Sequence, residues 1–198
     1  MNKKNHERTR KLVGVALFTA IIVVLQLLGA IIRFGPFSIS LVLVPIVVGA
    51  AVYGVGSGAW LGFVFGVAVL ASGDANAFMM VNPLGTVITV LLKGTCAGLL
   101  AGAVFALFQK LNRYVAVIIS AIVCPVVNTG IFLLGCKLFF IDTIAEWAVG
   151  AGFGADVGAY MIFVLVGANF LIEMAVNIVL APVIMRLIKA GKKESSAQ

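Results

Sequence analysis

The stretch TVITVLLKGTCAGLLAG, at residues 86–102, lies inside an apolar run and yet carries a lysine, Lys93. Gly94, Gly98 and Gly102 follow this lysine at four-residue spacing, which places them on one face of a helix. Small residues at this spacing let two membrane helices approach closely. The stretch therefore predicts a membrane-spanning helix that packs tightly against a neighbour and that must accommodate a charge.

The composition of the whole chain also indicates a membrane protein. Of its 198 residues, 63% are hydrophobic and only 11% are charged, whereas a soluble domain is about 45–50% apolar and about 25% charged. The mean hydropathy is +1.20. We therefore expect an all-α integral membrane protein in which residues 1–198 form a single domain.

Six apolar segments follow one another along the chain. They cover residues 12–32, 38–53, 57–72, 84–109, 114–137 and 159–187. About 20 helical residues are needed to cross a bilayer, so the second and third segments are short, and we expect either protein to shield them or the bilayer to thin around them. The sequence thus predicts a bundle of six transmembrane helices.

The net charge of +7 is concentrated at the ends of the chain. We expect residues 1–11 and 190–198 to form basic tails, and the positive-inside rule places both of them in the cytoplasm. The connections on the opposite side carry acidic residues, namely Asp74, Asp142, Glu146 and Asp156. Because topology accounts for the basic charge, it does not indicate a nucleic-acid partner.

Several functional classes lack their characteristic residues. The three cysteines lie in apolar segments without a CxxC pair, and the single histidine, His6, lies in the polar N-terminal tail, so we expect neither a metal site nor a cofactor. The sequence also lacks a G-x-x-x-x-G-K-[ST] phosphate loop and a nucleophilic triad. We therefore expect a protein that is not an enzyme, and active transport would take its energy from an ion gradient or another subunit.

Polar residues inside the apolar segments are candidates for function, because charges within a bilayer are rare. Thr86 and Thr89 precede Lys93 by seven and four residues, on one helical face that leads toward the outside. On the last segment, Asn169 and Glu173 have the same four-residue spacing. These residues predict two polar stripes near the middle of the membrane, which would face each other if the two segments are neighbours.

Two interpretations of these residues remain open. In the first, Lys93 and Glu173 form an ion pair, and asparagines such as Asn128 hold helices together. In the second, the same residues line an outward-facing cavity for a small polar molecule, covered by external loops. The two interpretations are compatible, since an ion pair can orient a binding site.

The chain also resembles a known family over nearly its whole length. The segments ALFTAIIVVLQ at residues 16–26 and GPFSISLVLVPIVVGAAVYGVGSGAWLGFVFG at residues 35–66 are similar to those of the substrate-binding S components of energy-coupling factor (ECF) vitamin transporters. The resemblance implies that the last three spans and the external loops bind a water-soluble vitamin at the outer side. It also implies a plasma-membrane location and a membrane coupling protein, the T component, with two cytoplasmic ATPases. Ala16 and Ala20 would face that coupling protein.

The segment pattern is most similar to pantothenate-type components, and riboflavin, folate or another micronutrient is the alternative. We expect seven side chains to bind the vitamin: Arg33, Thr89, Lys93, Asn128, Trp147, Asn169 and Glu173. The cations suit a carboxylate, the amides and hydroxyl suit hydroxyl or amide groups, and aromatic side chains would stack on a larger vitamin. A stand-alone carrier that uses Glu173 for protons and a membrane scaffold without transport activity are the other classes.

Overall fold

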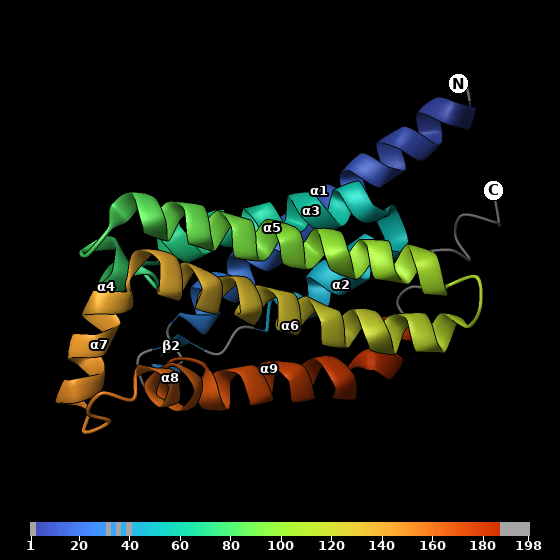
Figure 1. The fold of residues 1–198 in the computed structure, drawn as a ribbon. Helices are drawn as coiled ribbons and strands as arrows, with labels where there is room; N and C mark the ends of the chain where they lie inside the picture. The colour runs from blue at the N-terminus through green and yellow to red at the C-terminus, as the bar shows by residue number, and fades with distance from the viewer. Residues whose placement is uncertain (1–2, 31–32, 35–36, 39–40, 187–198) are drawn as a thin grey trace.

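A computed structural model describes the backbone of residues 3–30, 33–34, 37–38 and 41–186. Long helices run side by side along one axis, and shorter helices close one end of the bundle (Figure 1). The longest are α1 (Lys3–Gly29), α3 (Val55–Ser72), α5 (Pro83–Phe108) and α6 (Arg113–Phe139). The shorter elements are β1 (Arg33–Phe34), β2 (Phe37–Ser38), α2 (Leu43–Tyr53), α4 (Asn76–Met79), α7 (Ile141–Gly150), α8 (Val157–Tyr160), the π-helical turn η1 (Met161–Val166) and α9 (Gly167–Val179).

Within the described residues, four helices are long and apolar enough to cross a membrane. The pair Val157–Val166 and Asn169–Val179 is long and apolar enough only when taken together, which brings the number of candidate spans to five, and it is bent by 44° where the π-helical turn ends. The helix expected over residues 38–53 begins only at Leu43, because Phe37–Ser38 pairs with Arg33–Phe34 in an antiparallel hairpin. Six full-length spans are therefore not present in the described chain.

The short helix α2 lies inside the bundle. Its 11 residues reach about 16 Å, roughly half of the hydrocarbon thickness. Eight of those residues are buried, so protein shields most of this helix from its surroundings. Gly54 alone separates α2 from α3, and its φ of 96° belongs to a backbone conformation that favours glycine. The glycine-rich stretch at residues 54–58 is thus mostly the first turn of α3.

Helices α3 and α5 contact each other through their glycines. A Cβ atom added to Gly62 would collide with the carbonyl of Gly94, and one added to Gly58 would collide with the carbonyl of Gly98. At Gly102, an added Cβ would come within 3.0 Å of the Val55 Cα atom. The close packing predicted from the three glycines of residues 86–102 is therefore confirmed, and α3 is the partner.

Asparagine side chains fix where the two longest central helices begin. The Gly85 N–H donates to Asn82 Oδ1 at 2.9 Å, and Pro83 occupies the first helical turn of α5. At α6, the N–H of Tyr114 donates to Asn112 Oδ1 at 2.8 Å. Both are N-cap arrangements, which satisfy backbone donors that the helix itself leaves unpaired.

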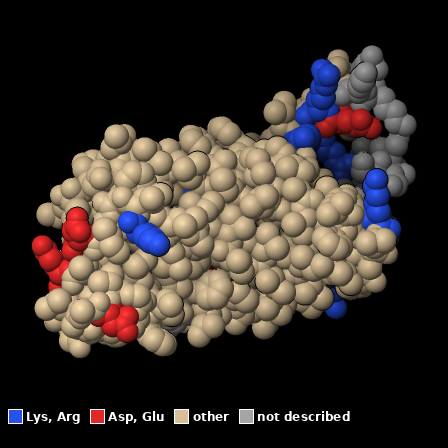
Figure 2. Space-filling model, in the orientation of Figure 1, with Lys and Arg blue, Asp and Glu red and all other residues tan. Residues whose placement is uncertain are grey.

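Charged residues gather at opposite ends of the bundle. Most Lys and Arg side chains in view lie at the end where α1 begins, beside an acidic side chain, whereas most Asp and Glu side chains lie at the end covered by α7, where a basic side chain is also exposed (Figure 2). Between them the visible face is almost free of charge. The expected N-terminal tail is partly helical, because α1 starts at Lys3 rather than near Leu12.

Candidate functional site

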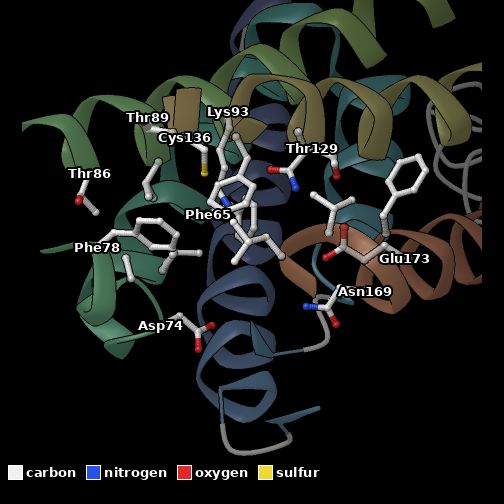
Figure 3. Close-up of a pocket in the computed structure, with 18 of the residues that line it drawn as sticks. Phe65, Asp74, Phe78, Thr86, Thr89, Lys93, Thr129, Cys136, Asn169 and Glu173 are labelled. Atoms are coloured by element: carbon white, nitrogen blue, oxygen red, sulfur yellow. The ribbon is translucent and has the colours of Figure 1, made fainter. Parts of the chain in front are cut away.

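One cavity lies between α5, α6 and α9, near the end of the bundle that carries α4 and α7 (Figures 1 and 3). It offers about 110 Å³ of space to the centres of water-sized molecules, several times the roughly 10–15 Å³ that one water needs. Its polar lining comprises Gln26, Asp74, Thr86, Thr89, Lys93, Asn128, Thr129, Asn169 and Glu173. The cavity thus has room for a small molecule and polar groups to orient it.

Helix α5 contributes Thr86, Thr89 and Lys93, which share one helical face. The two threonines differ in their hydrogen bonds. The Thr86 hydroxyl donates to the backbone carbonyl of Asn82 at 2.8 Å, whereas Thr89 Oγ1 is buried and has no hydrogen-bond partner among the described residues. Such an atom costs about 1–3 kcal/mol unless something pairs with it, so Thr89 is available to a bound molecule.

The ammonium group of Lys93 lies between two aromatic rings. Lys93 Nζ is 5.8 Å from the centroid of Phe65 on α3 and 5.3 Å from the centroid of Phe132 on α6. Both distances are in the range of cation–π interactions, which contribute about 0.5–2 kcal/mol each. The two rings therefore stabilise the ammonium group inside the cavity.

Two carboxylates also act on Lys93. The negative charges of Glu173 on α9 and Asp74, which follows α3, interact favourably with the ammonium. Asp74 Oδ2 accepts a hydrogen bond from Gln26 Nε2 at 2.6 Å, and Gln26 is buried on α1. The cavity thus contains charges of both signs, and a hydrogen bond joins its wall to α1.

Helix α6 contributes Asn128 to the wall opposite α5. Asn128 is 5% exposed, and its Oδ1 atom has no hydrogen-bond partner in the described part of the chain. Asn128 lies three residues after Pro125, whose ring removes a backbone donor from the helix. Asn128 and Thr89, which both line the cavity, therefore each have a buried polar atom without a partner among the described residues.

Helix α9 contributes Asn169 and Glu173 just after the bend at Gly167. Their side chains and Lys93 point toward the same space (Figure 3). One turn further on, Asn177 Nδ2 donates to the backbone carbonyl of Glu173 at 2.8 Å. The π-helical turn before the bend is a feature that is frequent at functional sites.

Aromatic rings form the outer wall of the cavity. Phe78 on α4 is buried and packs edge-on against Phe140 at 5.0 Å and Trp147 at 5.5 Å between centroids. Phe78 and Phe140 line the cavity, whereas Trp147 lies behind them on α7. Trp147 therefore reaches the cavity only through Phe78.

The structure brings together five of the seven side chains that the sequence suggested for binding. Thr89, Lys93, Asn128, Asn169 and Glu173 all line the cavity. Trp147 supports its wall, and the side chain of Arg33 lies outside the described part of the structure, although its backbone belongs to β1. Ala16 and Ala20 are exposed on α1.

The sequence did not indicate three side chains that line the cavity, namely Gln26, Phe65 and Phe132. Gln26 is the one amide in the apolar run at residues 12–32, and this could have marked it as functional. Phe65 and Phe132 gave no such signal, because phenylalanine is common in membrane helices. Across the described residues, no group of three His, Cys, Asp or Glu side chains is placed to hold a metal ion.

Comparison with protein families gives one match. The model of the family described as ECF transporter, substrate-specific component, covers residues 10–185. Comparison with curated proteins and with solved structures finds no match. The family match includes every described residue that lines the cavity.

Proposed function

The chain belongs to the family of ECF transporter substrate-specific components, and we propose that its cavity binds a water-soluble vitamin for ATP-driven uptake. It is a multi-pass protein of the cell membrane. Members of this family are transport subunits rather than enzymes, and the family implies a small-molecule substrate, a T component and partner ATPases. The identity of the vitamin and the route of energy coupling are our proposals.

One observation carries the proposed binding site. Thr89 Oγ1 and Asn128 Oδ1 are buried, belong to residues that line the same cavity, and lack partners among the described residues. Buried polar atoms in native proteins are nearly always paired. A ligand with hydroxyl or amide groups would pair with both atoms, and its apolar parts would lie against Phe78 and Phe140.

Pantothenate is our first candidate for that ligand. Its carboxylate would meet Lys93, its hydroxyl and amide groups would meet Thr89 and Asn128, and its methyl groups would contact the phenylalanine rings. Riboflavin and folate are the alternatives, because the same rings offer stacking surfaces to a larger aromatic vitamin. In each case Asn169 and Glu173 would bind the ligand from α9.

We propose that the end of the bundle with the basic side chains faces the cytoplasm. The separation of basic and acidic residues in Figure 2 supports this orientation through the positive-inside rule. The cavity then opens toward the outside, beside α4 and α7. Ala16 and Ala20 lie on an exposed face of α1, where their small side chains would let the T component approach closely.

Calorimetric titration tests the binding proposal. The purified chain is titrated in detergent with pantothenate, riboflavin, folate and other vitamins, and we expect one of them to bind with a Kd below about 1 μM. No binding across the panel would contradict the proposed site. Uptake by the chain alone into liposomes, driven by a pH gradient, would instead indicate a proton-coupled carrier.

The docking proposal needs a separate test. We expect Ala16→Trp to leave vitamin binding unchanged but to abolish ATP-dependent uptake by the assembled transporter, because the indole would keep the T component away from α1. Ile21→Trp is the control, since Ile21 is 36% exposed on the same helix but lies about 100° or more around it from Ala16 and Ala20. Full uptake by the Ala16→Trp variant would show that this face is not the docking surface.

A further inference from the structure

A carboxylate, Asp74, borders the cavity at the turn that follows α3. Helix α3 ends at Ser72, and the next residue, Gly73, has a φ of 79°, the left-handed conformation in which glycine commonly ends a helix. The N–H of Asn76 then donates to the Gly73 carbonyl at 3.1 Å where α4 begins. Asp74 is thus held in a short hydrogen-bonded turn, and it lines the cavity.

Gln26 on α1 fixes the position of this carboxylate. Its Nε2 atom donates to Asp74 Oδ2 at 2.6 Å and to Ser72 Oγ at 3.3 Å. The Ser72 hydroxyl in turn donates to the Val69 carbonyl at 3.0 Å. Because an amide nitrogen carries two N–H groups, Gln26 can donate to both side chains at once. The carboxylate is therefore held by a side chain that is itself fixed against the end of α3.

The burial of Gln26 is unusual for α1. Among the described side chains of this helix, only Ile22 and Gln26 are buried, and Gln26 is 2% exposed. The two residues lie four apart, on one face of the helix. An apolar side chain such as Ile22 is enough to pack α1 against the bundle, whereas burying an amide costs free energy unless it is hydrogen-bonded. The bonds to Asp74 and Ser72 meet that requirement.

Asp74 lies apart from the two other charged side chains that line the cavity. Lys93 comes from α5 and Glu173 from α9, and Figure 3 shows the three side chains on different sides of the cavity. An ionised carboxylate accepts hydrogen bonds and donates none, and its two oxygens can accept about four of them. The bond from Gln26 uses one of these positions. A ligand group that bonds to Asp74 must therefore be a donor, such as a hydroxyl or an N–H.

We propose that Asp74 binds a hydroxyl or N–H group of the ligand, and that Gln26 is the positioning residue that holds the Asp74 carboxylate in place. This inference rests on the proposed vitamin-binding function and adds a donor-binding position to the same site. It also sets the orientation of pantothenate, which has a carboxylate at one end and a hydroxyl at the other. The carboxylate would bind at Lys93 and that hydroxyl at Asp74, which leaves the second hydroxyl and the amide for Thr89 and Asn128.

Calorimetric titration of the full chain in detergent tests the role of Asp74, with pantothenate, riboflavin, folate and the other vitamins of the panel as probes. Asp74→Asn keeps the shape of the side chain and an oxygen for Gln26, but it removes the charge. We expect it to raise the Kd of the vitamin that binds the wild type about tenfold. Asp142→Asn is the matched control, because Asp142 is exposed on α7 and does not line the cavity.

Two results of this titration would overturn the proposal, and they are distinguishable. If the wild type and Asp74→Asn bind the same vitamin with equal Kd, the role of Asp74 is wrong while the proposed function stands. If the wild type binds no vitamin of the panel, the proposed function fails and this inference fails with it.

A double-mutant cycle tests the positioning role of Gln26. Gln26→Met keeps the length of the side chain and removes the donor, and we expect the Kd to rise about fivefold. In an Asp74→Ala background the same change should alter the Kd by less than about twofold, because no carboxylate is left to position. Equal losses in both backgrounds would show that Gln26 does not act through Asp74 and would overturn its positioning role.

Two further variants complete this cycle. Gln109→Met is the control, because Gln109 bonds to the Ala106 carbonyl three residues earlier and does not line the cavity, and we expect it to bind like the wild type. Gln26→Asn keeps the amide but withdraws it from Asp74, since its side chain is one methylene shorter. It gives the same test, with the same expected losses, if Gln26→Met does not fold.

Discussion

Helices α3 and α5 meet through backbone, whereas α6 and α9 carry buried polar side chains where they line the cavity. In the first contact, glycine carbonyls such as those of Gly62 and Gly94 leave no space for a side chain. In the second, Asn128 Oδ1 has no hydrogen-bond partner among the described residues. The first contact depends on shape alone, whereas the second leaves a buried polar atom that a ligand could pair.

Because of this difference, we expect the two sides of the cavity to differ in rigidity. The glycine contact fixes α5 against α3, and so it fixes Thr89 and Lys93 in one place. The opposite wall carries Asn128 and Glu173 on helices with a proline and a bend, which are features that weaken the regular helical hydrogen bonding. We call the α5 side of the cavity, with Thr89 and Lys93, the fixed wall. We expect it to keep its shape when a ligand binds, and we expect α6 and α9 to adjust their positions to the ligand.

The largest effect should come from filling the glycine contact. Gly62→Leu puts a side chain where the Gly94 carbonyl lies, so α3 and α5 must separate, and we expect no folded protein. Size-exclusion chromatography and thermal unfolding measure this. Gly56→Leu is the control on the same helix, because an added Cβ there meets no atom within 4 Å. Equal stability of the two variants would show that the glycine contact is not tight.

The next largest effect should follow removal of the charge from the fixed wall. If the ligand is an anion, Lys93→Met should weaken its binding about 10- to 100-fold, because a charged hydrogen bond contributes about 1.5–3 kcal/mol. Calorimetry measures the change in Kd. Lys137→Met is the matched control, since Lys137 is an exposed lysine of α6 that does not line the cavity. An unchanged Kd in the Lys93 variant would exclude Lys93 as a ligand-binding residue.

A smaller effect should come from removing one unpaired hydroxyl. Thr89→Val keeps the shape of the side chain and removes Oγ1, which should raise the Kd about fivefold to tenfold if the ligand bonds to it. Thr95→Val makes the same change on the same helix, but the Thr95 hydroxyl already donates to the Leu91 carbonyl at 2.7 Å. We expect the control to bind like the wild type, and equal losses in both variants would argue against a specific role for Thr89.

The smallest change in ligand affinity should come from removing Trp147, which lies behind the aromatic rings that line the cavity. Trp147→Ala removes a ring that packs against Phe78 without removing any atom that lines the cavity. A pair of rings contributes about 0.5–1.5 kcal/mol, so we expect the Kd to rise about threefold while the protein stays folded. A loss as large as that of Lys93→Met would mean that Trp147 contacts the ligand directly.

The sequence predicted that the helix containing residues 86–102 packs tightly, but it did not predict that α3 is the helix it packs against. The spacing of Gly94 and Gly98 is visible in the sequence, but the identity of the partner helix depends on how the bundle is assembled. The same limit applies to Lys93. A buried charge needs partners, and the sequence suggested a carboxylate. The rotation of α5 also brings Lys93 between Phe65 and Phe132, two rings that the sequence did not indicate.

Hydropathy also overestimated the length of the second helix. The run at residues 38–53 is mostly apolar, with Ser38 and Ser40 at its start, but hydropathy measures transfer into an apolar medium and does not report whether the backbone is helical. The hairpin of β1 and β2 takes up the expected start of that helix. Two of the seven residues expected to bind the ligand are not among those that line the cavity. Trp147 contacts Phe78, which lines it, and the Arg33 side chain lies outside the described structure.

The most direct measurement of the central claim is an experimental structure of the chain with its vitamin bound. The account predicts the ligand between α5, α6 and α9, with polar atoms within hydrogen-bond distance of Thr89 Oγ1 and Asn128 Oδ1. A ligand bound elsewhere, or protein groups paired with both of those atoms while the ligand is present, would contradict it.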